Sequence, residues 1–291
     1  MERFAELLIA SILLAGLYAT MAYGLGLIYG VLRIVNLNHG GMIMAGAYAG
    51  WWLHEELGID PYLALLPVAL AAFLVGVLTY VLLVRRLPRG AAGGVQSLLL
   101  LFGVWLVVRN AAYLMFTGND QTVRTSYSTL AVPLAGALVS VNRLAVFAAA
   151  LATLVILHLL LRKTYLGKAI RAVAQNPESC TLVGISVERI YMLTFGLGTA
   201  LAAVAGLLGA TLFPFNPSFG AGELLKSFVV VVLGGLGSIA GTAIAALILA
   251  LVEVFAILVI PAYLTAAVGF VLLVLVLVLR PGGLFGQRVL G

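Results

Sequence analysis

The stretch RIVNLNHGGMIMAGAYAG, residues 33–50, breaks a long apolar run with two asparagines, a histidine and adjoining glycines. The preceding residues 1–30 are long and apolar enough to cross a bilayer, since about 20 helical residues span its roughly 30 Å hydrocarbon core. We interpret them as the first transmembrane helix and not as a cleaved signal, which is shorter. An unpaired amide or imidazole facing lipid is costly, so Asn36, Asn38 and His39 are expected to face protein or water.

The composition places the whole chain among membrane proteins. Of 291 residues 64% are hydrophobic, and the ten Asp and Glu residues are too few to solvate a soluble surface of this size. The net charge of +6 does not indicate a nucleic-acid partner, because the Lys and Arg residues cluster beside apolar segments, where membrane topology explains them. Cys180 is the only cysteine, which excludes an intrachain disulfide or a cysteine-rich metal site, and we expect no metal and no cofactor.

Apolar segments recur along the chain in a way that suits a bundle of membrane helices. In lipid the backbone must satisfy its own hydrogen bonds, and the alternating pattern of about ten residues that marks a membrane barrel is absent. The sequence therefore predicts an all-α fold in one domain, residues 1–291, a polytopic transmembrane helical bundle whose segments include broken or re-entrant ones. These eight or nine segments are expected near 5–31, 40–53, 61–84, 95–116, 143–161, 188–212, 224–239, 241–260 and 262–279.

The basic residues set the expected orientation, because short loops rich in Lys and Arg stay in the cytoplasm. The RRLPRG loop and the region 162–188 are both predicted to be cytoplasmic, and so is the C-terminal tail. By parity the acidic segment 54–60 and the polar stretch 117–142 fall outside, as would the N-terminus for an odd number of crossings. The basic residues concerned are Arg85, Arg86, Arg89, Arg162, Lys163, Lys168, Arg171, Arg189, Arg280 and Arg288.

A second glycine-broken segment, SFVVVVLGGLGSIAGTAIAAL, covers residues 227–247 and suggests that the chain has two related halves. Broken helices in matching positions of two halves are how transporters expose backbone groups at mid-membrane. Close helix packing is the alternative, and we favour it for Gly46 and Gly50, while a hydrogen-bonded cap between helices is an equal alternative for the polar residues. The residues expected to line a substrate route are Asn36, Asn38, His39, Gly40, Gly41, Gly234, Gly235, Gly237 and Ser238.

Residues 167–185, GKAIRAVAQNPESCTLVGI, follow a pattern of helix, break and helix. Pro177 can begin a helix at its first position, and Gly184 can end that helix in the left-handed conformation. A short amphipathic helix flanked by basic residues is either a passive interfacial element or a docking surface, and the residues alone leave both open.

Four patches in this order resemble the permease subunits of branched-chain amino acid ABC importers: GLIYGVLRIVNLNHGGMIMAGAY, the region from Gly167 to Leu208, SFVVVVLGGLGSIAGTAIAALIL and RPGGLFG. The resemblance implies a subunit of a bacterial or archaeal plasma (inner) membrane that pairs with a second homologous permease. It also implies two cytoplasmic ATP-binding subunits and an extracytoplasmic substrate-binding protein. The chain itself has no Walker A phosphate loop, so ATP hydrolysis is expected on the partners and the chain is not expected to be an enzyme.

By position, residues 167–185 resemble the family's coupling helix, which sits in a groove of the ATPase; we call them the coupling segment. Cys180 stands where an alanine is usual, and Asn38 replaces a residue that is often small and apolar. The implied mechanism is alternating access, with leucine, isoleucine or valine as substrates, although related permeases carry urea or short amides. The coupling residues implied are Gly167, Ala169, Arg171, Ala172, Glu178, Gly184 and Ile185.

Two other classes of function are alternatives to an ABC permease subunit. An ion-coupled secondary transporter, or a channel for a small polar solute such as urea, would use Glu253, because a carboxylate within an apolar run is often functional. We favour a structural carboxyl there, since no second acid lies nearby in the sequence to form a relay. An intramembrane enzyme is weaker still, because the chain has neither a Gly-x-Ser-x-Gly nor a His-Glu-x-x-His pattern.

The charge pattern makes a direct prediction about topology. A tag at residue 90 or 291 should be protected from outside reagents in intact cells, whereas a tag at residue 120 should be labelled, because the first two sites adjoin basic clusters. Labelling of residue 90 from outside would reverse the orientation and remove the coupling segment from the cytoplasm.

Overall fold

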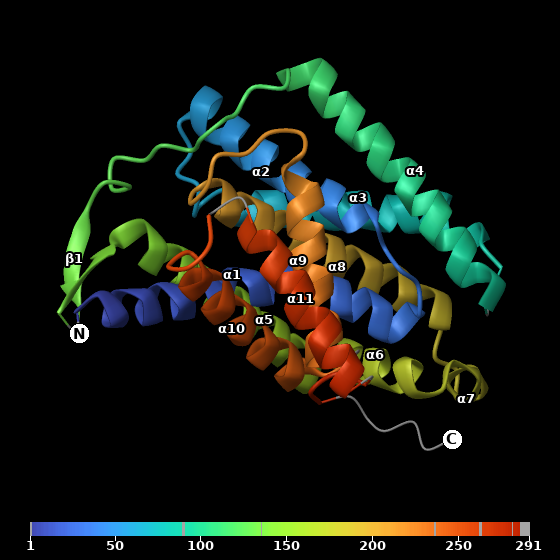
Figure 1. Cartoon of the computed structure of the whole chain (residues 1–291). Coiled ribbons are helices and arrows are strands. Elements are labelled where there is room, and N and C mark those ends of the chain that lie inside the picture. Colours follow the sequence, from blue (N-terminus) through green and yellow to red (C-terminus); the bar gives the residue numbers. More distant parts are fainter. Residues whose placement is uncertain are drawn as a thin grey trace.

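The structure is a computed structural model that describes residues 2–88, 91–134, 136–235, 237–261, 264–280 and 282–285 (Figure 1). Arg89 and Arg288 of the orientation argument, and the tag sites 90 and 291, lie outside the described residues. The elements in chain order are α1 (Glu2–Leu32), α2 (Asn38–Leu57), α3 (Leu65–Leu82), η1 (Val84–Arg86), α4 (Ala91–Phe116), β1 (Ala131–Leu134), β2 (Ala137–Ser140), α5 (Val141–Lys163), α6 (Tyr165–Gln175), α7 (Pro177–Leu182), α8 (Val187–Ala210), α9 (Phe219–Gly234), α10 (Ile239–Ala256) and α11 (Thr265–Leu279).

Each of the nine apolar segments expected from the sequence contains a helix, so the prediction of a helical membrane bundle is confirmed. Within the described ranges five helices are long and apolar enough to cross a membrane, namely α1, α3, α4, α5 and α8. A small antiparallel hairpin of β1 and β2 departs from the all-α prediction. It lies in the polar stretch 117–142, with Ala131 opposite Ser140.

Residues 33–37, between α1 and α2, leave the helical conformation; Arg33 is exposed and Asn36 is buried. Arg33 begins this break with a left-handed backbone, φ 58°. Gly24 of α1 is squeezed between the carbonyl of Gly198, in the middle of α8, and the ring of His39, because a Cβ there would lie 2.6 Å and 2.9 Å from them. α2 therefore begins in the interior, and the predicted broken helix is confirmed.

A matching break separates α8 from α9 at residues 211–218. α9 begins beside the start of α2, since a Cβ at Gly40 would collide with the carbonyl oxygen of Gly220, and a Cβ at Gly220 with that of Gly40. Met44 and Leu224 flank this contact. The first turns of α2 and α9 thus cross backbone against backbone, which only glycine on both sides allows.

The helices around these two breaks form two corresponding sets. α1 packs on α8, α9 and α10, whereas α8 packs on α1, α2 and α3; α4 lies against α2 as α11 lies against α9. Ile28 contacts Gly198 and Met21 lies near Gly209, so α1 and α8 run antiparallel. The contact pattern supports the predicted pair of related halves, with α1 to α4 inverted relative to α8 to α11.

The sequence paired the wrong second break with the first. It matched residues 33–50 with residues 227–247, but the latter contain the tight turn between α9 and α10 and not the start of a half-helix. Gly234 and Gly241 meet backbone to backbone at this turn. Glycine is needed there for close approach, so similar composition arises at two places for different geometric reasons.

Glycine also governs the contact between α2 and α8. A Cβ at Gly46 would collide with the backbone of Ala203, and one at Gly206 with the carbonyl of Ile43. A Cβ at Gly50 would collide with the buried side chain of Leu207 and not with backbone among its three nearest atoms. The packing interpretation of Gly46 and Gly50 is confirmed, because small residues let the two helix backbones approach.

The first structural prediction separates these two positions. Gly46→Ala should destabilise the protein by about 1–3 kcal/mol, as overpacking against an immobile backbone does, while Gly50→Ala should cost less. Protein abundance in the membrane and the temperature of unfolding in detergent measure the difference. Gly103→Ala is the control, since its Cβ would meet open space; equal abundance of all three variants would contradict the packing role.

Candidate functional site

The polar residues of the first break are fully enclosed by this chain. Asn36, Asn38 and His39 are buried, and His39 Nε2 lies 2.9 Å from the carbonyl oxygen of Met21. That carbonyl can only accept, so Nε2–H donates and Nδ1 is left as an acceptor. Among the described residues Nδ1 has no partner, nor do the Oδ1 atoms of Asn36 and Asn38. Their burial agrees with the expectation that these residues face protein or water and not lipid.

The adjoining glycines serve close packing in this conformation. Gly40 carries the crossing with α9, and a Cβ at Gly41 would lie 2.6 Å from Asn38 Oδ1 and 3.2 Å from Trp105 of α4. No space for a substrate lies between these backbones. The first half of the expected route is therefore closed in the conformation described.

The second half of the expected route lies elsewhere, at the turn that follows α9. Gly235 and Gly237 have left-handed backbones, φ 91° and 87°, and Ser238 Oγ accepts from the backbone N–H of Gly241 at 3.0 Å to cap α10. Gly237 faces Gly30 of α1, 3.7 Å from where a Cβ of Gly30 would be. The structure thus does not bring the two predicted groups of route residues together.

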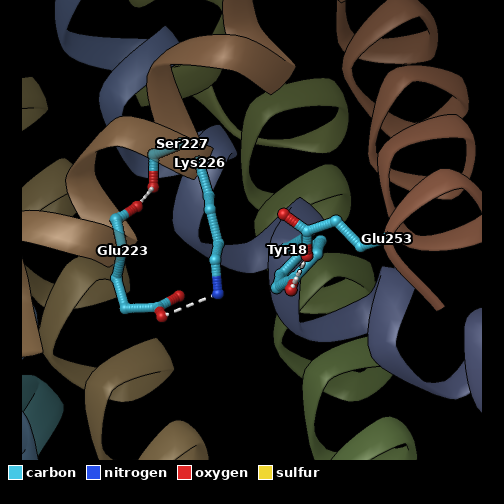
Figure 2. Close-up of polar contacts among 5 residues, drawn as sticks. All are labelled: Tyr18, Glu223, Lys226, Ser227 and Glu253. Carbon is cyan, nitrogen blue, oxygen red and sulfur yellow. Dashed lines mark hydrogen bonds and ion pairs between the residues drawn. The ribbon is translucent and has the colours of Figure 1, made fainter. Parts of the chain in front are cut away.

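A cluster of ionisable side chains joins α9 to α1 and α10 (Figure 2). Lys226 Nζ lies 3.0 Å from Glu223 Oε1 and 5.2 Å from the centre of the Tyr18 ring. The Tyr18 hydroxyl donates to Glu253 Oε2 at 2.5 Å. Figure 2 shows the ammonium of Lys226 between the Glu223 carboxylate and the Tyr18 and Glu253 pair.

This cluster corrects the expectation that Glu253 has no second acid nearby. Glu223 and Lys226 lie within electrostatic reach of Glu253 once α9 and α10 pack together. The sequence analysis did not name either residue. Lys226 lies within the apolar run 224–239 and Glu223 lies just before it, and a charge in a membrane segment is rarely without function, so both could have been recognised. Glu223 and Glu253 are both 7% exposed, so their charges depend on Lys226 and Tyr18.

One face of α9 is open beside this cluster. The Lys226 side chain is 25% exposed, Leu225 is exposed, and a Cβ at Gly222 would meet open space. A charged group on a helix at this depth is costly in lipid, so such groups face the interior of a bundle or a water-filled space. At this open face of α9, formed by Gly222, Leu225 and Lys226, the Lys226 side chain reaches the outside of the chain.

A third charge missed from the sequence is Arg109 of α4. Its Nη2 donates to Ser218 Oγ at 3.2 Å, and its guanidinium lies over the rings of Trp105 and Tyr113, at 5.6 and 5.5 Å. The Tyr113 hydroxyl also hydrogen-bonds to Ser218 Oγ, at 2.8 Å. Arg109 therefore ties α4 to the residue that precedes α9.

The coupling segment has the predicted helix, break and helix. Thr164 Oγ1 caps α6 by accepting from Gly167 N at 3.1 Å, and Asn176 Oδ1 caps α7 by accepting from Ser179 N at 2.9 Å. Pro177 opens α7, and Gly184 has a left-handed φ of 80°. The local interpretation of this stretch is confirmed.

The predicted coupling residues divide between the inside and the outside of the protein. Gly167 and Ala169 are buried, and α6 packs against α5, α8 and α1, so these two residues hold the helix in place and cannot touch another subunit. Arg171 donates to the carbonyl of Leu161. The remaining residues are exposed or half-buried: Arg171, Ala172, Glu178, Gly184 and Ile185.

The most exposed apolar side chains of this region were not predicted. Leu182 is 88% exposed and Val183 is 75% exposed, at the end of α7 beside Gly184. Two adjacent exposed apolar residues at the end of a helix are a candidate contact surface for another protein. Their signal in the sequence was an apolar pair just before a helix-ending glycine.

The comparisons agree with this architecture. A family model described as "Branched-chain amino acid transport system / permease component" matches residues 7–279. The high-affinity branched-chain amino acid transport system permease protein BraD of Pseudomonas aeruginosa is 30% identical over 295 residues, 98% of this chain and 96% of that protein. LivH of Escherichia coli, with the same description, is 28% identical over 299 residues, again 98% and 96%.

The similarity extends to archaea. A probable branched-chain amino acid transport permease protein LivH of Methanocaldococcus jannaschii is 29% identical over 251 residues, 84% of this chain and 78% of that protein. No solved structure matches the chain. On the match over residues 7–279 and the near full-length relatives, the chain belongs to the family of permease components of branched-chain amino acid transport systems.

Proposed function

We propose that the chain is the permease subunit of an ATP-driven importer that moves branched-chain or related amino acids across a bacterial or archaeal plasma membrane. The observation that carries the proposal is near full-length similarity to permeases with that named substrate. The bundle of apolar helices with two internal breaks supports it, since broken helices meeting at mid-membrane are a transporter feature.

The energy for transport must come from other subunits. The sequence has no phosphate-binding loop, so two cytoplasmic ATP-binding subunits, a second permease and an extracytoplasmic substrate-binding protein complete the proposed importer. ATP-driven closure of the two ATPases would move the coupling segments, and the helix breaks would act as hinges between inward-open and outward-open forms.

The ATPase docks, in this proposal, on the end of α7. Leu182 and Val183 supply exposed apolar area, and Glu178 is exposed on the same short helix. Ala172 is a less direct contact than the family resemblance implies, because it packs partly against the buried side chains of its own chain. The docking surface is therefore the α7 end of the coupling segment, held in place by α6.

The substrate route is proposed to run along the open face of α9. Lys226 and Glu223 are a cation and an anion held together at membrane depth and partly open to the outside of the chain. The ammonium of Lys226 suits the carboxylate of a zwitterionic amino acid, and the carboxylate of Glu223 suits its ammonium. Lipid tails offer no partner to either charge. The second permease would cover this face, so that the route lies between the two subunits and not through the closed crossing of α2 and α9.

The ion-coupled alternative receives no support. Its main argument was Glu253, which does have a second acid, Glu223, within electrostatic reach, but the family of the chain and its near full-length relatives fit the ATP-driven class. Relatives with other substrates include a glucose ABC transporter permease protein of Haloferax volcanii, which is also a transporter subunit of the ATP-driven kind.

Reconstitution tests the proposal as a whole. The permease should co-purify with ATPase subunits, and uptake of leucine into proteoliposomes should require ATP inside and the binding protein outside. Uptake that continues without ATP but follows an ion gradient would overturn the proposed function.

A charge at the α7 surface should uncouple the importer. Leu182→Asp should leave permease abundance unchanged, because the side chain is exposed, while co-purification of the ATPases and uptake both fall at least about tenfold, since desolvating a carboxylate at an interface costs a few kcal/mol. Leu182→Met, which keeps the apolar contact, is the control. Normal ATPase binding by Leu182→Asp would place the docking surface elsewhere.

Substitutions of Glu223 and Lys226 should affect the stability of the protein and its transport activity separately. Lys226→Met leaves Glu223 as a buried unpaired charge and should destabilise the protein by about 3–5 kcal/mol. Adding Glu223→Gln should restore much of the abundance by removing that charge, with Glu253 still held by the Tyr18 hydroxyl, yet leucine uptake should stay low. If the double variant transports at the rate of the unmodified protein, the pair has a structural role only.

A further inference from the structure

A hollow of about 520 Å³ lies between α1, α5, α6 and α10, at the membrane end where the coupling segment lies. Arg162, at the end of α5, and Arg171, on α6, form its charged part. Leu157 and Ile170 are among the apolar side chains on its walls, and Gly237 and Thr242 line it from the start of α10. Gly237 and Ser238 of the expected route and Arg171 of the coupling segment line it, but the route proposed along α9 does not pass through it.

The charged part is cationic and has unused donors. Among the described residues Arg162 makes no hydrogen bond or ion pair, and Arg171 spends one guanidinium nitrogen on the Leu161 carbonyl, which leaves the others. No Asp or Glu stands among the described residues that line the hollow. The α10 N-terminus, behind Ser238, adds the positive end of a helix dipole to the same space.

The apolar part continues along α5 toward the lipid-facing surface. A second hollow of about 240 Å³ shares Tyr23, Leu157, His158 and Leu161 with the first, and it is lined further by Leu154, Val155 and Leu159. Val155 and Leu159 are each 48% exposed, so the groove opens on the outside of the bundle. The combined space is therefore cationic at one end and apolar along its length.

We propose that this space binds an anionic phospholipid. Its phosphate would lie against Arg162 and Arg171, where guanidinium groups donate in pairs to phosphate oxygens. One acyl chain would follow the apolar groove of α5. Basic pockets between membrane helices at the water interface suit anionic head groups in this way. The proposal goes beyond transport itself and rests on the proposed function only for the side of the membrane, the cytoplasmic leaflet.

A lipid explains the shape of the site better than a free anion does. Inorganic phosphate would fill only the space beside the two arginines and would leave the apolar groove of Leu154, Val155 and Leu159 unused. A bound lipid would contact α6 through Ile170 and Arg171, and α10 through Thr242. It would thus connect α6, which positions the coupling segment, to α10.

Thermal unfolding of the delipidated importer complex in detergent tests the site. Added phosphatidylglycerol should raise the unfolding temperature of the unmodified complex, whereas phosphatidylcholine and inorganic phosphate should not. Arg162→Gln should weaken the apparent affinity for phosphatidylglycerol on the order of tenfold, as loss of a charge-assisted contact does. Ala174→Phe, which fills the hollow at α6 and keeps both arginines, should weaken it as well.

Lys163→Gln is the matched control. It removes the same charge from the next residue of α5, which is exposed and does not line the hollow, so stabilisation by phosphatidylglycerol should persist. Equal loss in Lys163→Gln and Arg162→Gln would reduce the effect to general surface charge and overturn the site. Stabilisation by inorganic phosphate equal to that by lipid would show a free-anion site instead. Neither result depends on uptake, so failure here is distinct from failure of the proposed function.

Discussion

The crossing of α2 and α9 at Gly40 and Gly220 is the contact on which the rest of the fold depends. Each glycine lies against the backbone carbonyl of the other, so neither position has room for a Cβ. This contact fixes where both half-helices begin, and therefore where the unwound residues 33–37 and 211–218 must run. Since helices in lipid gain little from hydrophobic burial, such close van der Waals contact is a main source of their association.

The same constraint places the polar groups. Because α2 begins in the interior, Asn36 and His39 are buried, and His39 donates to a backbone carbonyl of α1. Because α9 begins there too, Glu223 and Lys226 come to lie beside Glu253 of α10 and Tyr18 of α1. Buried charges persist only when paired, so the cluster ties the position of α9 to that of its two neighbours.

The sequence was sufficient for most features that depend on residues close together in the chain, the β1–β2 hairpin excepted. Apolar runs of the right length gave the membrane helices, and the break at residues 33–50 was recognisable from its amides and glycines. The start of α7 at Pro177 and its left-handed end at Gly184 followed from the restricted backbones of those residue types. Close packing at Gly46 and Gly50 followed from their four-residue spacing.

Only the tertiary structure decided what lies across the bundle. Composition paired the wrong glycine break with the first one, because a tight helix turn and a half-helix start both need glycine. The sequence predicted that Glu253 is isolated from other acids. That prediction was wrong because the neighbours of Glu253 come from α9 and α1, far away in sequence. Leu182 resembled any apolar helix residue until its exposure was known. Backbone preference and hydropathy can be read from short stretches of sequence. Contacts between distant helices depend on how their surfaces fit together, and no short stretch determines that fit.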